Sequence, residues 1–278
     1  MSGTATAPTS LPTWLERPLV VGLGVTGAAV VAALKGRGAQ VVVVDDHPSE
    51  ATRGRADSLG VELVDVPAAG WEDLVAGSSV VLPSPGVPDS HPVMAAARTT
   101  GPGVASEFDV AAAFDDRPIV TITGTNGKTT VTALVTSMLR SSGRRAVDAG
   151  NTEVPLVEAI EDSSVEVFVV EASSFRLGHT RHFAPRVGTW LNFAPDHLDV
   201  HSTLASYESA KARIWSDDPT TVAVANLDDP VVSAHLPEAG RVVGYGLGAA
   251  AEGSWTESDG RLVGPGGEVL VEVDELWS

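Results

Sequence analysis

Residues 119–130 read IVTITGTNGKTT. An apolar, β-branched run typical of a buried strand is followed at once by a glycine-rich turn, a lysine and two threonines. When such a turn joins a strand to a helix, its backbone N–H groups can surround an anion, and the lysine and first threonine can reach phosphate oxygens and Mg²⁺. The stretch therefore predicts a phosphate-binding loop in an α/β sheet.

The predicted loop has the pattern G-x-x-G-K-T, which is shorter than a strict Walker A motif because Ile122 stands where that motif has its first glycine. A shorter loop can still bind phosphate oxygens through its backbone amides, with Lys128 on the β and γ phosphates and the Thr129 hydroxyl on Mg²⁺. A plain surface turn is the alternative. The residues predicted to bind ATP phosphates are Gly124, Thr125, Asn126, Gly127, Lys128, Thr129 and Thr130.

Short apolar runs alternate with helix-compatible segments on both sides of this loop. The runs before it are PLVVGLG, AQVVVVDD and SSVVLPSPG, and those after it are VEVFVVEASS, RVGTWLNF and TTVAVANLDDP. Residues 26–35, 128–140 and 204–215 are among the predicted helices, and short strands with glycine-rich turns are expected after residue 240. This alternation predicts parallel sheets built from βαβ units.

The predicted organisation has two α/β domains, because 278 residues exceed the usual size of one. We expect a flexible N-terminus (1–16), a Rossmann-like parallel-sheet domain (17–115) and a P-loop-type α/β central domain (116–278). The boundary is predicted near residues 113–118, where charge and a proline interrupt the pattern.

Composition excludes several classes of function. The chain has no cysteine, so disulfides, thiolate metal sites and a cysteine nucleophile are absent, and a metal must bind oxygen or imidazole. A net charge of −18 argues against binding nucleic acid through its phosphates. There is no apolar stretch long enough for a membrane helix and no signal peptide pattern. A soluble, cytoplasmic protein is expected.

A second glycine motif lies near the N-terminus, where VVGLGVTG places Gly22, Gly24 and Gly27 in the pattern G-x-G-x-x-G. It follows a predicted strand and opens a predicted helix, and Asp45 ends the next strand. The amide end of that helix can bind a phosphate, and the carboxylate can bind a sugar hydroxyl or a base. NAD or another nucleotide diphosphate could use these groups. Glycines that only allow close packing are the alternative.

Polar residues also follow two strands of the second predicted sheet. Glu171 ends one strand, where a carboxylate beside the phosphate loop is suited to Mg²⁺, although an ordinary exposed glutamate is the alternative. The stretch NFAPDHLDVH holds Asp196, His197, Asp199 and His201. His197 is predicted at the Mg²⁺ site; a solvated turn is the alternative, and a zinc pair of His197 with His201 lacks a third ligand.

Three further residues are expected at the surface on spacing alone. His179 and His182 lie in the polar stretch GHTRHF. Lys211 lies in YESAKARIW, which is predicted to form an amphipathic helix, and there it would ordinarily be a solvated lysine.

Seven short motifs occur in one order along the chain: GLGVTG, SPGVP, TGTNGKTT, GNTEVPL, EASSF, NFAPDHLD and YESAKARI. Together they resemble the Mur ligases of peptidoglycan synthesis over residues 17–230, and among these the branch that adds D-glutamate. The phosphate-loop, DHLD and SAK elements are specific to the Mur and folylpolyglutamate ligase superfamily. The glycine-rich first domain with SPG separates the chain from folylpolyglutamate synthases.

The resemblance implies an ATP-dependent ligase. In the family, ATP phosphorylates the terminal carboxylate of UDP-N-acetylmuramoyl-L-alanine, the amine of D-glutamate attacks the acyl phosphate, and ADP and phosphate leave. The implied cofactors are ATP and two Mg²⁺ ions, and the implied partners are the two substrates. We expect a monomer with no nucleic-acid and no membrane partner.

The resemblance also implies roles for single residues. The first glycine motif would hold UDP, and the residues implied for the UDP substrate are Gly24, Val25, Thr26, Asp45, Asp46, Ser84, Asn151 and His197. The implied catalytic residues are Lys128, Glu171, His197 and Lys211, and the implied metal ligands are Thr129, Glu171, His197 and Lys211. Lys211 matches the family's carbamylated lysine, in which CO₂ converts the amine into a carboxylate that binds a second Mg²⁺.

Two departures from the family pattern stand out. Arg176 occupies the position where the family usually has glutamine in SSFQL. The chain also ends before the family's GxHNxxN segment and third domain of roughly 150 residues, so we expect it to bind the UDP substrate without ligating on its own. The alternatives are a sister ligase for another amino acid, a noncatalytic nucleotide-binding module, and an NAD-dependent oxidoreductase, which would leave GTNGKTT unexplained.

Overall fold

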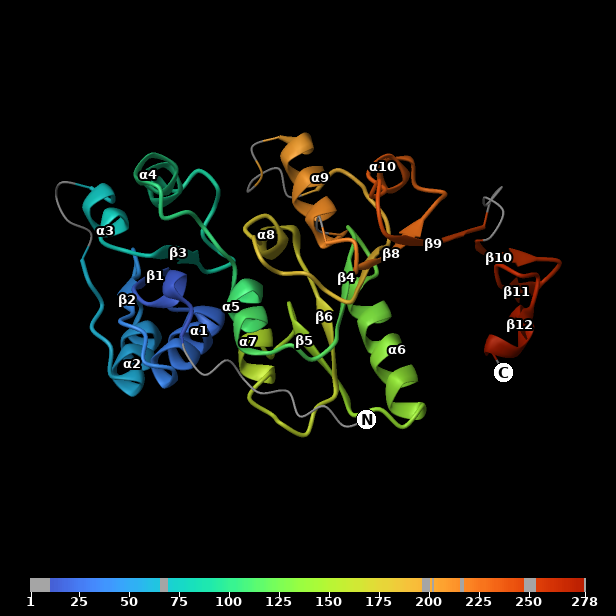
Figure 1. The fold of residues 1–278 in the computed structure, drawn as a ribbon, viewed down its shortest axis with the longest axis horizontal. Helices are drawn as coiled ribbons and strands as arrows, with labels where there is room; N and C mark the ends of the chain where they lie inside the picture. The colour runs from blue at the N-terminus through green and yellow to red at the C-terminus, as the bar shows by residue number, and fades with distance from the viewer. Residues whose placement is uncertain are drawn as a thin grey trace.

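Two β-sheets, most of whose strands are parallel, lie side by side with helices packed against them (Figure 1). The computed structural model describes residues 11–65, 70–196, 201, 203–215, 218–247 and 254–277. No helix within these residues is long and apolar enough to cross a lipid bilayer. The predicted α/β fold class is confirmed.

The small sheet has three parallel strands in the order β2-β1-β3. The elements of this part are η1 (Thr13–Leu15), β1 (Pro18–Val21), α1 (Val25–Gly36), β2 (Val42–Val44), α2 (Glu50–Leu59), α3 (Glu72–Ala76), β3 (Val80–Pro83) and α4 (Pro92–Thr100).

Helices cover both faces of the small sheet because neighbouring residues of β1 point to opposite sides. Leu19 and Val21 pack in a cluster with Met94 of α4, whereas Val20 packs with Val30 and other residues of α1. All four β1 residues are buried, which accounts for the continuous apolar run in the sequence.

Helix α1 lies against the end of β1 only because residue 27 is glycine. A Cβ atom at Gly27 would lie 2.1 Å from the Gly22 carbonyl oxygen and 2.8 Å from Ser84 Oγ. Any side chain there would push the amino end of α1 away from the strands. The first glycine motif therefore fixes the start of α1 directly beside β1 and β3.

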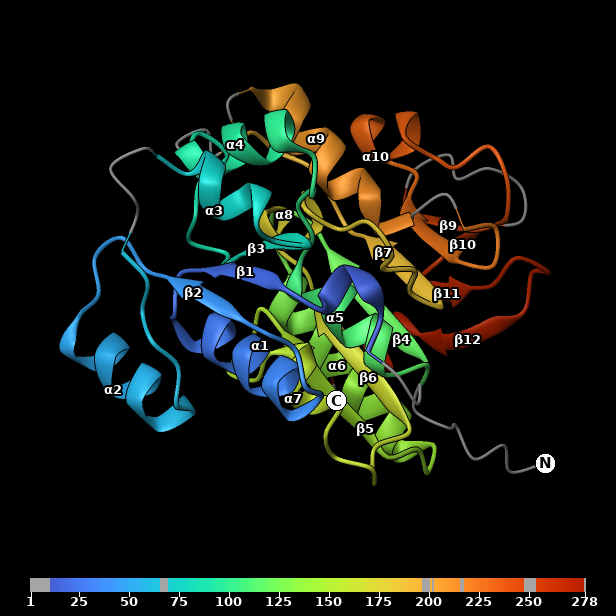
Figure 2. The same cartoon turned by 60° about the vertical axis from the view of Figure 1, so that its left-hand side comes forward.

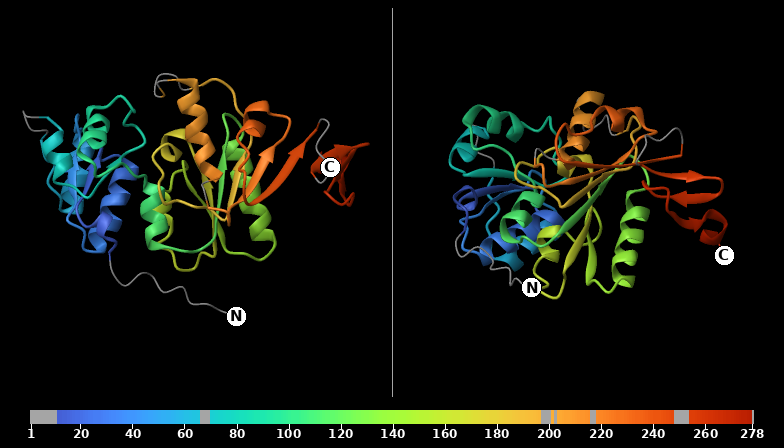
Figure 3. Two further views of the ribbon diagram at one scale, coloured as in Figure 1. Left: turned by 45° about the horizontal axis from the view of Figure 1, so that its top comes forward. Right: turned by 45° about the vertical axis from the view of Figure 1, so that its right-hand side comes forward.

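The large sheet has nine strands in the order β12-β11-β10-β9-β8-β7-β4-β6-β5. Its strands are β4 (Ile119–Thr123), β5 (Ala146–Gly150), β6 (Val167–Glu171), β7 (Val187–Trp190), β8 (Val222–Asn226), β9 (Arg241–Gly246), β10 (Trp255–Ser258), β11 (Arg261–Val263) and β12 (Val269–Glu272). Pairing is parallel from β5 to β10 and antiparallel across β10-β11-β12. The C-terminal strands extend the sheet at the end farthest from the small sheet (Figure 3).

The helices of this part cover both faces of the parallel strands (Figure 2). They are α5 (Glu107–Phe114), α6 (Lys128–Ser141), α7 (Leu156–Ala159), α8 (Ser174–Leu177), α9 (Leu204–Ala212) and α10 (Pro230–Ala234), with η2 (Arg213–Trp215) and η3 (Val273–Trp277). Val169 packs with α6, whereas Phe168 and Val170 belong to the core shared with α5 and α7, so α6 lies on the opposite face from those two helices.

The strands and helices predicted by their ranges are all present. Those after residue 240 join the large sheet as its C-terminal strands. Sequence patterns did not predict β5, β10 or the short helices α3, α7, α8 and α10, nor α2 and α5.

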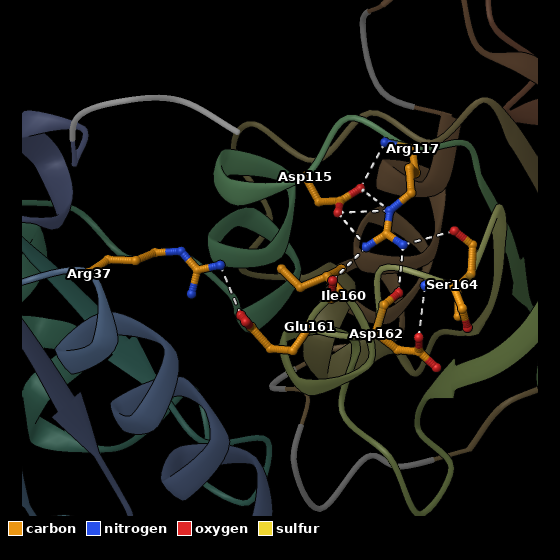
Figure 4. A network of polar contacts seen from close by, with 8 residues as sticks. Arg37, Asp115, Arg117, Ile160, Glu161, Asp162 and Ser164 are labelled. Atoms are coloured by element: carbon orange, nitrogen blue, oxygen red, sulfur yellow. Dashed lines mark hydrogen bonds and ion pairs between the residues drawn. The ribbon is translucent and has the colours of Figure 1, made fainter. Parts of the chain in front are cut away.

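The two sheets meet through helices α1, α5 and α7, which lie between them in Figure 1. At the carboxyl end of α1, Arg37 pairs with Glu161 at 2.8 Å, and its guanidinium lies 4.1 Å from the centre of the Phe114 ring (Figure 4). This contact joins the helix of the small sheet to the loop that follows α7.

Arg117 holds that loop in place (Figure 4). Its guanidinium pairs with Asp115 and donates to the carbonyl oxygens of Ile160, Asp162 and Val165. It also lies 4.7 Å from the centre of the Phe168 ring. Because these donors all belong to one mostly buried cation, Arg117 fixes the loop that places Glu161 beside Arg37.

We predict that Arg117→Met lowers the free energy of unfolding by about 2–4 kcal/mol, because three carbonyl groups lose their donor in a mostly buried site. Urea denaturation followed by circular dichroism measures the loss. The matched control is Arg145→Met, where the side chain is 65% exposed and its pair with Glu166 should contribute less than about 1 kcal/mol. Equal losses for the two variants would contradict the role given to Arg117.

Candidate active site

The phosphate loop lies between β4 and α6, as predicted from the sequence. Gly127 precedes the first residue of α6 with a φ of 83°, a conformation that favours glycine. Among the described residues no side chain caps this end of the helix, so the first-turn N–H groups of α6 are available to an anion. Lys128 Nζ donates to the carbonyl oxygens of Gly124 and Thr125 at 3.0 and 3.1 Å, so the ammonium lies over the loop.

Three polar side chains meet beside the loop. Thr129 Oγ1 donates to Glu171 Oε2 at 2.8 Å, and Asn151 Nδ2 donates to the other oxygen of the same carboxylate at 3.0 Å. Glu171 ends β6 and is 3% exposed. The parallel pairing of β4, β6 and β5 brings the three residues together, because the carboxyl ends of parallel strands lie at one edge of the sheet.

The segment after β7 braces the phosphate loop. Asn192 accepts from the Asn126 backbone N–H at 2.9 Å and donates to the Asn126 carbonyl at 3.1 Å, so one amide side chain holds both polar groups of that residue. Thr125 Oγ1 exchanges hydrogen bonds with the backbone of Ala194. Asn192 was not among the predicted site residues, although it is the first residue of the motif NFAPDHLD.

Lys211 reaches the loop from α9 and is buried. Its side chain is among the largest with under 2% exposure, and Nζ donates to the Gly124 carbonyl at 2.8 Å. Burial, with a smaller contribution from the nearby Lys128 charge, lowers the pKa of Lys211 from 10.5 to about 7. The solvated lysine expected from spacing alone is therefore wrong; the role implied by the family resemblance, a carbamylated ligand of a second Mg²⁺, stays a prediction.

One described histidine, His179, differs from the expectation of an exposed side chain. His182 is exposed as expected, but the side chain of His179 is only 18% exposed, and its Nε2 lies 3.5 Å from Asp89 Oδ1. Desolvation by burial lowers the pKa of His179. His201 is buried, with Nε2 2.8 Å from Ser174 Oγ. His197 and Asp199 lie outside the described residues.

The described residues fit one kind of magnesium site. They contain no group of three or more His, Asp or Glu side chains that could hold a metal ion. Thr129 and Glu171, however, place a hydroxyl and a carboxylate together beside the phosphate loop. Mg²⁺ prefers oxygen ligands and commonly takes its remaining ones from water and substrate phosphates. The pair is therefore suited to a magnesium ion that arrives with a nucleotide.

A separate pocket of about 430 Å³, here called the α1 pocket, lies where α1 begins at the edge of the small sheet. The structure brings together here the residues predicted to bind UDP in the first part of the chain, and it adds Arg176 from the large sheet. The lining residues are Val21, Gly22, Gly24, Val25, Thr26, Asp45, Asp46, His47, Ser84, Pro85, Gly86, Val87 and Arg176. Asn151, by contrast, lies at Glu171 beside the phosphate loop.

Hydrogen bonds fix the polar side chains of the α1 pocket. Asp45 accepts from the backbone N–H groups of Leu23 and His47, at 2.9 and 3.2 Å. Ser84 Oγ donates to the Gly22 carbonyl at 2.7 Å, and Asp46 lies 2.6 Å from His91 Nε2. The first glycine turn is thus tied to both neighbouring strands, with the uncapped amino end of α1 facing the pocket.

Two known protein-family models together match most of the chain. The family described as the Mur ligase middle domain matches residues 122–271, and the MurD-like N-terminal domain of Mur ligases matches residues 16–106. The chain belongs to the Mur ligase family. The resemblance drawn from the seven motifs is confirmed.

Several curated relatives share one name, UDP-N-acetylmuramoylalanine–D-glutamate ligase. The relative from Frankia casuarinae is 41% identical over 95% of this chain and 57% of its own length. Those from Desulfotalea psychrophila and Geobacter metallireducens are 39% and 42% identical, over 84% and 77% of this chain. The chain spans about half the length of the curated relatives it matches.

A solved Mur ligase structure shares the fold. The crystal structure of UDP-N-acetylmuramate:L-alanyl-gamma-D-glutamyl-meso-diaminopimelate ligase from Neisseria meningitides matches with a TM-score of 0.54 and 17% sequence identity. The match covers 91% of this chain and 85% of that one. This likeness supports the arrangement of the two sheets.

We predict that Lys211 makes the protein more stable as pH rises from 7 to 9 in CO₂-free buffer. Between the folded pKa of about 7 and the ordinary value of 10.5, the unfolded chain binds one more proton than the folded chain, so the unfolding free energy rises with pH. Over two pH units this group should contribute up to about 2–3 kcal/mol.

Urea denaturation at the two pH values tests this difference. Lys211→Met should remove most of the rise in unfolding free energy between pH 7 and 9. Lys35→Met, at an exposed position of α1, should leave this rise in place. A rise that is unchanged in Lys211→Met would contradict the lowered pKa.

Proposed function

We propose that this Mur ligase joins UDP-N-acetylmuramoyl-L-alanine to D-glutamate with hydrolysis of ATP to ADP and phosphate, in the cytoplasm. The observation that carries the proposal is the 41% identity, over 95% of the chain, to a relative named for this reaction. The two separate phosphate-binding positions support it, because one nucleotide carries the substrate and another supplies the phosphoryl group. We also propose the domain division at residues 115 and 116.

The α1 pocket is proposed to hold the UDP part. The amino end of α1, with Val25 and Thr26, faces the diphosphate, and Ser84 lines the same pocket. Asp45 and Asp46 lie where carboxylates can accept hydrogen bonds from the base or the ribose. Asn151 and His197 are assigned to the muramoyl part.

The phosphate loop, from Gly124 to Thr130, is proposed to hold the ATP phosphates. Lys128 would leave the carbonyl groups it now contacts and bind the β and γ phosphates. Thr129 and Glu171 would hold one Mg²⁺, which supplies positive charge where the substrate carboxylate and the γ-phosphate meet. Asn192 would keep the loop in position for this transfer.

The reaction then needs two displacements. A carboxylate oxygen of the substrate attacks the γ-phosphorus, the bond to the β-phosphate oxygen breaks, and ADP leaves. The amine of D-glutamate, in its neutral form, attacks the carbonyl carbon of the acyl phosphate; the C–O bond breaks, phosphate leaves, and the amine nitrogen loses a proton. The loop and Lys128 stabilise the phosphate charge in the first displacement.

Lys211 is proposed to carry a carbamate. A neutral amine adds to CO₂, forms a C–N bond and releases one proton, which turns a buried cation into a carboxylate. The lowered pKa of about 7 supports this, because a large share of the amine is neutral at physiological pH. The carbamate, with His197, would then hold the second Mg²⁺.

Ligation should depend on D-glutamate and on Glu171. With the protein expressed from its whole reading frame, we expect phosphate release from ATP only when UDP-N-acetylmuramoyl-L-alanine and D-glutamate are both present. Glu171→Gln should lower kcat by about 10²- to 10³-fold with little change in binding of the UDP substrate, because a metal ligand is lost. Glu158→Gln, at an exposed position of α7, is the control and should keep full activity.

Other outcomes separate the alternative functions. Phosphate release with another amino acid in place of D-glutamate would identify a sister ligase. Tight binding of the UDP substrate without turnover would identify a noncatalytic nucleotide-binding module. A change in NADH fluorescence on mixing would favour an oxidoreductase.

Carbamylation has its own readout. With ¹³C-labelled CO₂ at pH 8, we expect a carbamate carbon resonance from a chain that has only three lysines, Lys35, Lys128 and Lys211. The resonance should grow between pH 6 and 8, as the Lys211 amine loses its proton, and should disappear in Lys211→Met but persist in Lys35→Met. A spectrum unaffected by Lys211→Met would assign the carbamate elsewhere.

A further inference from the structure

Arg176 belongs to α8, which follows β6 of the large sheet, yet it lines the α1 pocket beside the small sheet. Its side chain is 7% exposed. Nη2 donates to Thr26 Oγ1 at 3.0 Å, and Nη1 pairs with Glu107 Oε2 at 2.7 Å. Nε is buried and has no hydrogen-bond partner among the described residues. A purely structural arginine at this depth would be expected to use that donor.

The charges around the α1 pocket call for a cation. Asp45 and Asp46 line it, and the whole chain has a net charge of −18, so a diphosphate would be repelled without compensation. The twelve-residue helix α1 offers the partial positive charge of its amino end. Of the described residues that line the pocket, Arg176 is the only arginine or lysine.

Glu107 holds the guanidinium in this position. It is the first residue of α5; its side chain is 4% exposed, and its second oxygen accepts from the Val157 N–H at 3.0 Å. Burial raises the pKa of Glu107 even though Arg176 acts in the opposite direction. A carboxylate whose charge is disfavoured in this way can orient Arg176 while leaving part of its positive charge for a second anion.

We propose that Arg176 binds the phosphates of a nucleoside diphosphate in the α1 pocket, between its guanidinium and the first turn of α1, and that Glu107 is the positioning residue that holds Arg176 there. The assignment rests on the proposed function, which takes a UDP derivative as the ligand of this pocket. Where the family usually has a neutral glutamine, this chain thereby supplies a cation from the other sheet.

The test compares UDP with uridine, which lacks the phosphates, by isothermal titration calorimetry on the 278-residue chain. Arg176→Gln should weaken UDP binding about 10- to 100-fold and uridine binding less than about 3-fold, because only the phosphates contact the guanidinium. The UDP affinity of Arg176→Lys should fall between those of the wild type and Arg176→Gln. The salt dependence of UDP binding should become shallower in Arg176→Gln. Arg98→Gln, the same charge change at an exposed position of α4, should leave both affinities within about 2-fold.

Variants of Glu107 separate a binding role from a structural one. Glu107→Gln keeps the size and a hydrogen bond but removes the charge, so UDP should bind as tightly as in the wild type or up to about 5-fold tighter. Glu107→Ala should weaken UDP but not uridine, because Arg176 is no longer oriented. If Arg176→Gln fails to fold, the comparison of UDP with uridine binding in Glu107→Ala decides.

Three results would overturn the assignment: unchanged UDP affinity in Arg176→Gln, equal weakening of UDP and uridine, or a loss of UDP binding in Glu107→Gln as large as that in Arg176→Gln. A wild-type chain that binds no UDP would instead refute the proposed function, and the assignment with it.

Discussion

Helix α1 is fixed to the large sheet at both of its ends, and the shape of the α1 pocket depends on this attachment. At its amino end, Thr26 accepts from Arg176 of the large sheet. At its carboxyl end, Arg37 pairs with Glu161, on a loop that Arg117 holds through backbone carbonyl groups. Gly27 then lets the helix lie directly on β1. The position of the helix dipole, and so of the phosphates it would bind, is set by contacts from two distant parts of the chain.

Most of the lysines of this acidic chain lie at the phosphate loop. It has three lysines, and two of them, Lys128 and Lys211, lie at the phosphate loop. Burial of Lys211, with a smaller contribution from repulsion by the nearby Lys128 charge, lowers its pKa to about 7. A carbamate at Lys211 would remove the repulsion and supply an anion for Mg²⁺. The burial and the nearby positive charge that disfavour a protonated Lys211 would therefore favour the carbamylated form.

Local patterns were enough to predict most of the strands and the phosphate loop, because both depend on neighbours in sequence. The run IVTITG is buried as β4, and GKTT opens α6, as expected. Strand β5 was missed because AVDAG has little β-branched character, and it forms through its parallel pairing with β6. Lys211 shows the same limit: on its helix it resembles a solvated lysine, and only the packing of α9 against the loop buries it.

The contacts at the junction of the two sheets escaped prediction for a related reason. Arg176 and Thr26 are 150 positions apart, and Arg176 and Glu107 are 69 apart, so no short motif contains any of these contacts. One short segment also connects the phosphate-loop region with the α1 pocket. Glu171, beside the phosphate loop, and Arg176, in the α1 pocket, belong to one segment that runs from the end of β6 into α8. An anion bound by Arg176 would therefore order the same segment that carries the proposed magnesium ligand, and the two nucleotides would be placed relative to each other by a few residues of backbone.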